Sequence, residues 1–385
     1  MRVLETANVI TGPFTGMLLA DLGAHLVKVE STDGGDPFRK WESDSETTKP
    51  TFASYNHGKK SVALDLKSEP GRDVYRRLVA ESDVLIQNFR PGVMERLGLG
   101  WDDLQAVNPS LVYCHITGVG AEGPDAGRPI FDAVAQALSG LWSQFTDLDD
   151  PEPVGPPFAD QLTAVFAAYA IMAALHRTRG TGQGAKLEIS MLSACLAFQT
   201  MGVATLAADG AVPTKSSRAR QSQSYAVIAG DGLPLAIHLS TPHKFWTGLC
   251  QAMGRPELVG DPRFATKPLR VQHYDELHDV LRTAFAARPR ADWLTTLVDH
   301  DVPAAPILTL AEAIDHPQVR ATGMLLEGPD GAGRSLMRSP VVVDGRRPAA
   351  DIHCPALGQD TAEVLSGIGL SEPERNELVR QGVVA

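Results

Sequence analysis

The stretch RVLETANVITGPFTGMLLADLGAHLVKVE, residues 2–30, decides the fold class. Residues 2–7 predict a short strand, apolar residues at helical spacing predict a helix over 12–24, and an alternating pattern predicts a strand over 25–30. The chain then repeats this alternation, with strands predicted at 61–66, 83–89 and 110–117 and helices at 71–82 and 92–99. Strands that alternate with helices indicate a parallel sheet with helices packed on it, so we predict an α/β fold.

The rest of the chain predicts a second, smaller domain. A chain of 385 residues suits two domains, each with its own core. The polar, small and basic stretch DGAVPTKSSRARQSQS (209–224) is predicted to be a linker, and SYAVIAGDGLPLAIHL (224–239) predicts a hairpin followed by helices. We predict a large domain over 1–205, a small α+β domain over 206–323, and a C-terminal segment, 324–385, that returns to the large domain.

Composition and cysteine spacing exclude several functions. The chain is 43% hydrophobic and 21% charged with a net charge of -11, which is ordinary for a globular protein and unlike a nucleic-acid binder. Its cysteines lie far apart without a CxxC pair, so neither a zinc site nor a disulfide framework is expected; they are Cys114, Cys195, Cys250 and Cys354. The N-terminus has no signal-peptide pattern and no segment reaches the roughly 18 apolar residues of a membrane span, so we expect a cytoplasmic protein without a membrane partner.

Two glycine-rich stretches look like phosphate-binding loops but lack the right context. GVGAEG (118–123) follows a predicted strand, yet the PDAGRP after it cannot open a helix, so a dinucleotide site is not predicted. RGTGQGAK (179–186) lies between a helix and a strand and is better interpreted as a turn. His238 and His243, at the borders of predicted elements, are expected to be structural or exposed.

Asp160 stands in front of a run, to about residue 176, that is apolar nearly all round and predicts a buried helix. An aspartate in this place is a favoured helix cap. A carboxylate held at a helix N-terminus is also ionised and fixed in direction, as a nucleophile must be. Local sequence leaves both interpretations open.

Several long blocks in order resemble the class III CoA-transferases, the CaiB/BaiF family that includes formyl-CoA and carnitine CoA-transferases. The blocks are residues 2–30, NHGKKSVALDLKSEPGRD (56–73), SDVLIQNFRPGVMERLGLG (82–100), NPSLVYCHITGVGAEGP (108–124), RPIFDAVAQALSG (128–140) and VPAAPILTLAEAIDHPQVRATGM (302–324). The resemblance runs from residue 2 to about residue 365. It implies a large Rossmann-like domain with a parallel sheet, a small domain, and two chains interlocked into a homodimer.

The resemblance also implies a covalent mechanism. ADQLTAVFAAYAIMAAL (159–175) places Asp160 at the family's catalytic aspartate. Its carboxylate would attack an acyl-CoA thioester to give a mixed anhydride, then an aspartyl-CoA thioester, before CoA passes to an acceptor carboxylic acid. Asp132 matches an acidic position that is expected to orient groups. The substrates are an acyl-CoA and a carboxylic acid, and no metal or permanently bound cofactor is required.

The resemblance places coenzyme A along the loops that follow the predicted strands. The matching positions are Val9, Leu64, Lys67, Asn88, Phe89, Arg96 and Phe131. Arginine and lysine can bind phosphates and phenylalanine can pack against adenine, at the edge where nucleotides bind to such sheets. Backbone N–H donors are expected to stabilise the oxyanions, although the sequence does not name them.

The chain departs from the family pattern in two places, and this leaves alternatives open. Ile10 replaces a glutamine of formyl-CoA transferases, and RARQSQSY (218–225) lacks their glycines, so we expect a carboxylate other than formate or oxalate, with succinyl-CoA or another dicarboxylic acyl-CoA as the default donor. A related α-methylacyl-CoA racemase would need proton carriers where this chain has Phe131 and Thr241, which cannot exchange protons in that way. A third hypothesis, beside the transferase and the racemase, is a CoA-binding homologue without activity.

Overall fold

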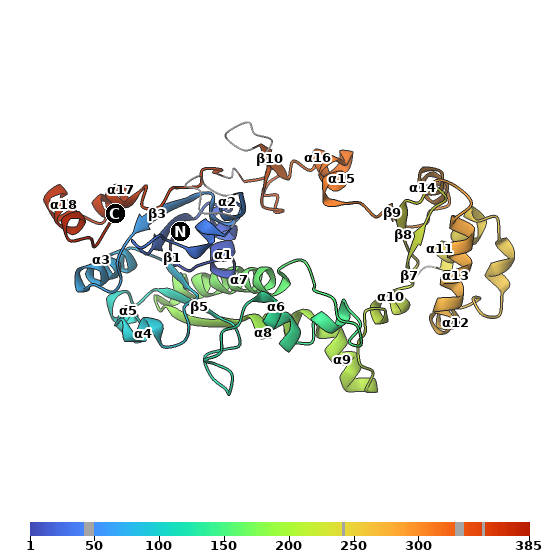
Figure 1. The fold of residues 1–385 in the computed structure, drawn as a ribbon, viewed down its shortest axis with the longest axis horizontal. Helices are drawn as coiled ribbons and strands as arrows, with labels where there is room; N and C mark the ends of the chain where they lie inside the picture. Colours follow the sequence, from blue (N-terminus) through green and yellow to red (C-terminus); the bar gives the residue numbers. More distant parts are fainter. Residues whose placement is uncertain (42–49, 241–242, 328–334, 349–350) are drawn as a thin grey trace. The chain divides into compact units, whose positions relative to one another are not determined.

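The computed structural model describes residues 1–41, 50–240, 243–327, 335–348 and 351–385 (Figure 1). The described chain clusters into a first unit, Met1–Trp142, Val154–Thr200 and Thr322–Ala385, and a second unit, Ser143–Pro153 and Met201–Ala321.

The elements of the first unit are β1 (Arg2–Thr6), α1 (Thr11–Ala20), β2 (His25–Glu30), η1 (Pro37–Lys40), α2 (Pro50–Asn56), β3 (Lys59–Ala63), α3 (Glu69–Ala80), β4 (Val84–Gln87), α4 (Val93–Arg96), α5 (Trp101–Val107), β5 (Val112–Thr117), α6 (Asp132–Leu138), η2 (Trp142–Gln144, which runs into the second unit), α7 (Phe158–Thr181), β6 (Ala185–Ser190), α8 (Met191–Phe198), β10 (Leu325–Glu327), β11 (Ser335–Met337), α17 (Thr361–Gly367) and α18 (Glu372–Arg380).

The first unit is built on a parallel sheet of six strands in the order β3-β2-β1-β4-β5-β6. Every neighbouring pair is parallel, so the α/β fold with a parallel sheet is confirmed. The strand order reverses between β1 and β4. In such doubly wound sheets, ligands bind outside the carboxyl ends of the strands at this switch point.

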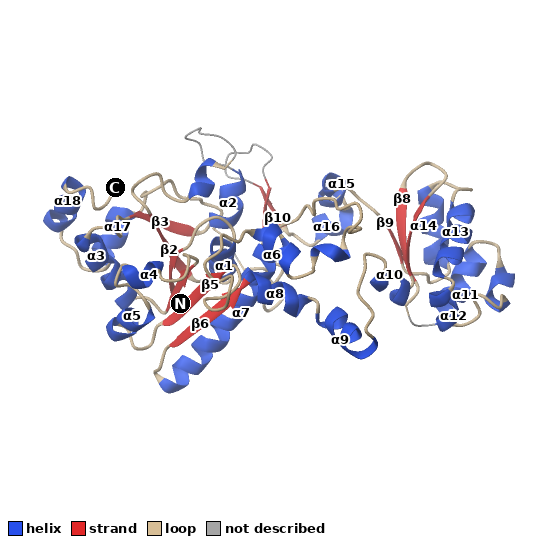
Figure 2. Ribbon diagram, turned by 60° about the horizontal axis from the view of Figure 1, so that its bottom comes forward, coloured by secondary structure: helices blue, strands red, loops and turns tan. Residues whose placement is uncertain are grey.

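Different helices cover the two faces of this sheet. Side chains alternate along a strand, so neighbouring residues of β1 face opposite sides. Val3 joins a core cluster with Leu19 on α1 and Ile171 on α7. Leu4 joins a second cluster with Leu78 on α3. Figure 2 shows α7 running beside β5 and β6. Both faces are therefore buried, which explains why the strands read as nearly continuous apolar runs.

Helix α7 is only partly buried in the single chain, so the expectation of a fully buried helix is wrong there. Ala167 and Ile171 pack against the sheet, whereas Val165, Tyr169 and Met172 lie half exposed on the other side. The helix contacts α1, α6, α8, β5 and β6, and these neighbours leave the surface around Val165, Tyr169 and Met172 uncovered. An apolar face is left open along much of its length.

The expectation that no segment is long and apolar enough to span a membrane is also wrong. Helix α7 has 24 residues and an 18-residue window of mean hydropathy 1.5, which meets that test by length and composition. The bent pair of α8 and α9 (Thr200–Asp209) meets it as well when the two helices are taken together. In the structure, α7 packs on the sheet as a central helix of the first unit.

The C-terminal segment packs on the β3 edge of the sheet. The backbone N–H of Asp65 donates to the carbonyl of Val383 at 2.8 Å, and Leu64 pairs with Val384. Thr361 accepts a hydrogen bond from the Ala63 N–H at 3.2 Å. In Figure 1, both chain ends lie in the first unit, with α17 beside β3.

The second unit has its own sheet and core. Its elements are α9 (Thr200–Asp209), α10 (Ser217–Ser222), β7 (Ser224–Ile228), β8 (Pro234–His238), α11 (His243–Ala252), η3 (Pro256–Gly260), α12 (Lys267–Gln272), α13 (Tyr274–Phe285), α14 (Arg290–Asp299), β9 (Ala304–Pro306), α15 (Leu310–Asp315) and α16 (Pro317–Ala321). Strands β7, β8 and β9 form an antiparallel sheet. The predicted hairpin is thereby confirmed, with Gly232 at a positive φ in its turn. Trp246, Leu277 and Trp293 fill the core.

The unit boundaries differ in detail from the predicted domain boundaries. Residues 143–153 cluster with the second unit, although the predicted large domain contains them. The stretch predicted as a linker contains α10. Arg220 of this helix forms an ion pair with Asp275 at 2.8 Å and lies 5.1 Å from the centre of the Tyr274 ring. The basic composition of this stretch therefore reflects contacts with α13.

Candidate active site

A cavity of about 220 Å³ lies at the carboxyl ends of β1, β4 and β5, where the sheet order reverses. Its lining comes from the β1–α1 loop and the start of α1, the β4–α4 loop, the end of β5 and the loop after it, and the starts of α7 and α8. The lining residues are Asn8, Val9, Thr11, Asn88, Phe89, Arg90, Pro91, Ile116, Thr117, Gly118, Val119, Ala126, Arg128, Pro129, Ile130, Phe131, Asp160 and Met191. The position agrees with the general rule for ligands in doubly wound sheets.

Asp160 lies in the wall of this cavity and is not the cap of α7. The helix begins at Phe158 after Pro157, so Asp160 is already within the first turn. Its Oδ1 accepts a hydrogen bond from the hydroxyl of Thr11, on the first residue of α1. The aspartate keeps 9% of its surface exposed. Its carboxylate therefore faces the ligand cavity, and the helix dipole favours its negative charge.

The surroundings of Asp160 make its carboxyl group less acidic than usual. Burial raises the pKa of Asp160 to about 6 from its ordinary value of 3.8. The hydrogen bond from Thr11 opposes this by lowering the pKa, and the nearby negative charge of Asp132 raises it further. The group is thus ionised at neutral pH but holds its charge in a poorly solvated place, which favours nucleophilic attack.

Asp132 lies beside Asp160 as the first residue of α6. Its Oδ1 accepts the backbone N–H of Asp160 at 3.1 Å, and its Oδ2 accepts the Gln136 amide at 2.6 Å. The same Gln136 amide donates to the Pro156 carbonyl at 3.2 Å. Asp132 thereby links α6 to the start of α7 and holds the backbone of Asp160.

The β1–α1 loop in front of Asp160 has an unusual backbone. Val9 has a φ of +69°, a left-handed conformation that is costly for a β-branched residue. The Asn8 N–H donates to Asn88 Oδ1 at 2.9 Å, and the Asn88 amide donates back to the Asn8 carbonyl at 2.8 Å. This reciprocal pair joins the loops after β1 and β4 across the switch point.

The residues predicted to bind coenzyme A divide into two groups. Val9, Asn88, Phe89 and Phe131 line the cavity together with Asp160. The other predicted positions, Leu64, Lys67 and Arg96, do not line it. Lys67 and Arg96 are exposed after β3 and on α4, so their role in binding phosphates stays a prediction. The Leu64 side chain is 1% exposed inside the core, so any contact from this residue would be through its backbone.

Sequence reasoning missed several polar residues that line the cavity, among them Thr11, Arg90 and Arg128. Thr11 bonds to Asp160, and Arg90 and Arg128 bring positive charge to the rim. Arg128 forms an ion pair with Asp125 at 2.9 Å. The two arginines stand in NFRPG and GRPIF, next to residues that were singled out, so their proximity to those residues was a usable signal. Thr11 carried the same signal, because it directly follows Val9 and Ile10, which were also singled out.

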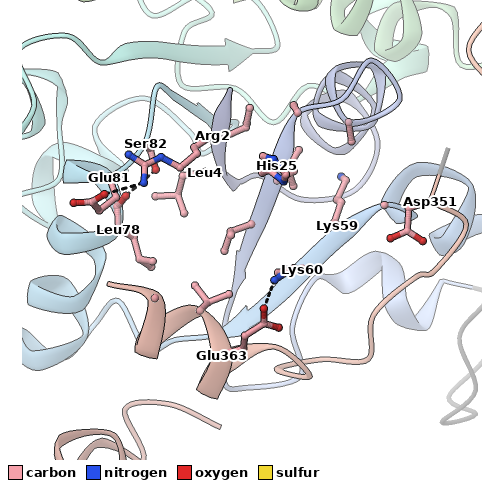
Figure 3. A pocket seen from close by; sticks show the side chains of 18 of the residues that line it. Arg2, Leu4, His25, Lys59, Lys60, Leu78, Glu81, Ser82, Asp351 and Glu363 are labelled. Atoms are coloured by element: carbon pink, nitrogen blue, oxygen red, sulfur yellow. Dashed lines mark hydrogen bonds and ion pairs between the residues drawn. The ribbon is translucent and has the colours of Figure 1, made fainter. Parts of the chain in front are cut away.

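A second cavity, of about 530 Å³, lies at the opposite, amino ends of β1, β2 and β3 (Figure 3). Four of its charged side chains form two ion pairs. Arg2 binds Glu81 at 2.8 Å, and Lys60 binds Glu363 at 2.5 Å. Its described lining includes none of the predicted site residues. The smaller cavity, which contains Asp160, is therefore the better candidate for the reaction.

The remaining sequence predictions concern the alternatives. Phe131, at one racemase position, is 68% exposed at the cavity, whereas Thr241, at the other, lies outside the described residues. Ile10 precedes α1 as its cap residue, and the glycine-free stretch 218–225 forms α10 and the start of β7. His238 is exposed and bonds Ser224 at 2.8 Å, and it is not one of the residues that line the cavity. His243 is exposed at the start of α11.

All four cysteines are free thiols, and the described residues contain no cluster of three potential metal ligands.

Known proteins resemble this chain along nearly its whole length. A sequence profile described as CoA-transferase family III matches residues 1–361. The chain is 34% identical to an acetyl-CoA:oxalate CoA-transferase of Acetobacter aceti, with 90% of this chain and 88% of that protein covered. It is 34% identical to a succinate–glutarate CoA-transferase of Agrobacterium fabrum, with 95% and 94% covered. The crystal structure of a CAIB/BAIF family protein from Brucella suis matches with a TM-score of 0.84 at 31% identity, over 96% of this chain and 98% of that one. The chain therefore belongs to the CoA-transferase family III and is a class III CoA-transferase.

Proposed function

We propose that this enzyme moves CoA from an acyl-CoA to a carboxylic acid through covalent intermediates on Asp160. The observation that carries the proposal is the Asp160 carboxylate, which lies in the cavity at the switch point and is bonded to Thr11. Burial raises the pKa of Asp160 to about 6, so the carboxylate is poorly solvated but still mostly ionised at neutral pH. Such a carboxylate is suited to attack a thioester.

The chemistry proceeds in two exchanges. One oxygen of Asp160 bonds to the thioester carbonyl carbon, the carbon–sulfur bond breaks, and CoA leaves as a thiolate. The thiolate then adds to the aspartyl carbonyl carbon and expels the first carboxylate, which leaves an aspartyl-CoA thioester. The acceptor carboxylate reverses both steps, so that acceptor acyl-CoA departs and the Asp160 carboxylate is restored.

The cavity lining suits the adenosine diphosphate and pantetheine parts of CoA. Phe89 and Phe131 offer apolar surfaces, and Arg90 and Arg128 offer positive charge, beside the loops of the switch point. We propose that Lys67 and Arg96 bind phosphate groups further along the same sheet edge. Asp132 holds the backbone of Asp160 and orients it for attack.

The relatives' names guide the choice of acids. They describe transfer to oxalate or between succinate and glutarate, all of which are dicarboxylates. We propose a dicarboxylic acyl-CoA, such as succinyl-CoA, as donor. Ile10 offers no hydrogen bond at the position where formyl-CoA transferases carry glutamine, so a longer acid is favoured over formate or oxalate.

We also propose that the enzyme is an interlocked homodimer of the cytoplasm. The apolar residues Val165, Tyr169 and Met172 on the open face of α7 would be covered in such a dimer. The free thiols suit a reducing compartment. Light scattering of the purified chain tests the assembly: a monomer at micromolar concentration would contradict it.

Intact-protein mass spectrometry tests the mechanism. The protein is incubated with acetyl-, succinyl- and glutaryl-CoA, with hydroxylamine trapping and peptide mapping. We expect a CoA or acyl adduct on the peptide that contains Asp160, which Asp160→Asn abolishes and Asp102→Asn, an exposed first-turn aspartate of α5, retains. An enzyme that forms no adduct but exchanges the α-proton of the acyl group with solvent deuterium would be a racemase, and the proposal would be wrong.

A further inference from the structure

Thr11 is placed to act on the reaction itself. Its hydroxyl donates to Oδ1 of Asp160, both residues line the same cavity, and both are buried. The two residues are 149 positions apart in the chain and belong to different helices, α1 and α7. The contact therefore arises from the fold, unlike the local bonds to nearby backbone groups that threonine hydroxyls can make.

We propose that Thr11 is a catalytic residue that stabilises the oxyanion formed on Asp160 itself. This inference rests on the covalent route proposed above and adds a donor to it. Because Thr11 occupies Oδ1, the attack on the acyl-CoA falls to Oδ2, and Oδ1 becomes the carbonyl oxygen of the mixed anhydride. The hydroxyl is then already bonded to the atom on which charge develops next.

The Thr11 hydroxyl acts as a hydrogen-bond donor in the step that forms the aspartyl-CoA thioester. The CoA thiolate adds to Cγ of Asp160, a carbon–sulfur bond forms, and the carbonyl electron pair moves onto Oδ1. The Thr11 hydroxyl stabilises this negative charge. The carbonyl then re-forms, the bond from Cγ to Oδ2 breaks, and the first carboxylate leaves with its electron pair. A donor fixed in place before the reaction is worth more than one that must move.

A buried charged network holds the backbone around Thr11 in place. Lys28 Nζ donates to the Ala7 carbonyl at 2.7 Å and pairs with Glu5 and Asp36 at 3.0 Å each. The Asp36 carboxylate accepts the Val9 N–H at 3.1 Å.

The same network holds the chain on the other side of Thr11. Lys59 Nζ binds Glu5 at 2.8 Å and the Pro13 carbonyl at 2.8 Å. The loop is thus fixed both before and after Thr11, which keeps Val9 in its strained conformation and the hydroxyl aimed at Asp160. Gly12 permits this arrangement, because a Cβ there would collide with the Ala7 side chain.

The test compares Thr11→Val, which keeps the shape but lacks the hydroxyl, with Thr11→Ser, which keeps the hydroxyl. Thr163→Val is the matched control. Thr163 is a buried threonine on α7, one turn after Asp160, and its hydroxyl donates to the Ala159 carbonyl at 2.6 Å. Single-turnover reactions with an acyl-CoA are quenched in acid, and the acyl adduct and the CoA adduct are quantified by intact mass. CoA affinity is measured by calorimetry.

We expect Thr11→Val to slow formation of the CoA adduct by about 100-fold, as when one oxyanion donor is lost, so that the acyl adduct accumulates. CoA affinity should stay unchanged, and Thr11→Ser and Thr163→Val should resemble wild type. The acid limb of the pH profile should move to higher pH in Thr11→Val, because the lost hydrogen bond had lowered the pKa of Asp160.

Three outcomes would overturn the inference in distinguishable ways. If wild type forms neither adduct, the proposed mechanism fails and this role for Thr11 fails with it. If wild type forms both adducts and Thr11→Val forms them at the same rate and ratio, only the role of Thr11 is wrong. If Thr11→Ser is as slow as Thr11→Val, the hydroxyl is not the active feature. Should Thr11→Val not fold, Thr11→Ser and Thr11→Ala are compared by the same criteria.

Discussion

Replacing Asp160 with asparagine should make the protein more stable at neutral pH while abolishing the reaction. The folded protein raises the pKa of Asp160 from 3.8 to about 6, mainly through burial. Between these values the folded chain holds a proton that the unfolded chain releases, so stability falls as pH rises through about pH 4 to 6. A shift of about two pKa units at about 1.36 kcal/mol each corresponds to roughly 3 kcal/mol.

The asparagine variant lacks this ionisation, and its amide oxygen can still accept the Thr11 hydroxyl. The stability difference between variant and wild type should therefore grow by roughly 3 kcal/mol from about pH 4 to pH 7 and stay level above that. At about 2–4 °C per kcal/mol for a unit of this size, the melting temperatures should separate by roughly 6–12 °C.

Differential scanning calorimetry at a series of pH values measures the effect. Asp102→Asn is the control, because Asp102 is also in the first turn of a helix but is exposed, and it should keep the pH dependence of wild type. If the difference in melting temperature between Asp160→Asn and wild type is constant across this pH range, the reasoning that burial raises the pKa of Asp160 is refuted.

Three further predictions concern Asp132 and the residues that hold the β1–α1 loop. Asp132→Asn should move the acid limb of adduct formation to lower pH, because a nearby negative charge that raises the pKa of Asp160 is removed; a limb that does not move would contradict this. Lys28→Met should destabilise the first unit by about 3–5 kcal/mol in urea unfolding, since it removes the lysine that pairs with the buried Asp36 carboxylate and one of the two lysines that pair with buried Glu5. Val9→Gly should be more stable than Val9→Ala by about 1–2 kcal/mol, because only glycine adopts this left-handed backbone without strain; equal stability would argue against the strain.

The alternation of strands and helices in residues 2–117 could be predicted because both faces of a parallel sheet are buried, which leaves apolar strands separated by amphipathic helices. The same local signals misplaced Asp160 by a few residues. An aspartate before an apolar run looks like a cap, whereas α7 begins at Phe158. Because helix boundaries depend on backbone geometry, only the structure distinguishes a cap from a first-turn residue.

Contacts between distant segments were out of reach of sequence patterns. Thr11 meets Asp160 across 149 positions, and Arg220 meets Asp275 from a stretch that looked like a linker. Periodicity along α7 likewise says that apolar residues are present on all sides, but it does not say which neighbour covers each side. The family resemblance supplied Asp132 and the cavity-lining Val9, which no local pattern assigns to a site, and it favoured the nucleophile interpretation of Asp160, which the local pattern had left open.

The pairing of Leu64 with Val384 has a consequence for how the chain is made. The edge of the first sheet cannot be closed until residue 384 has left the ribosome, long after β3 has emerged. At about 5–20 residues per second, the interval is roughly 15–60 s, and the whole of the second unit is synthesised within it. During this time β3 presents an unpaired strand edge, the kind of edge at which another chain can pair.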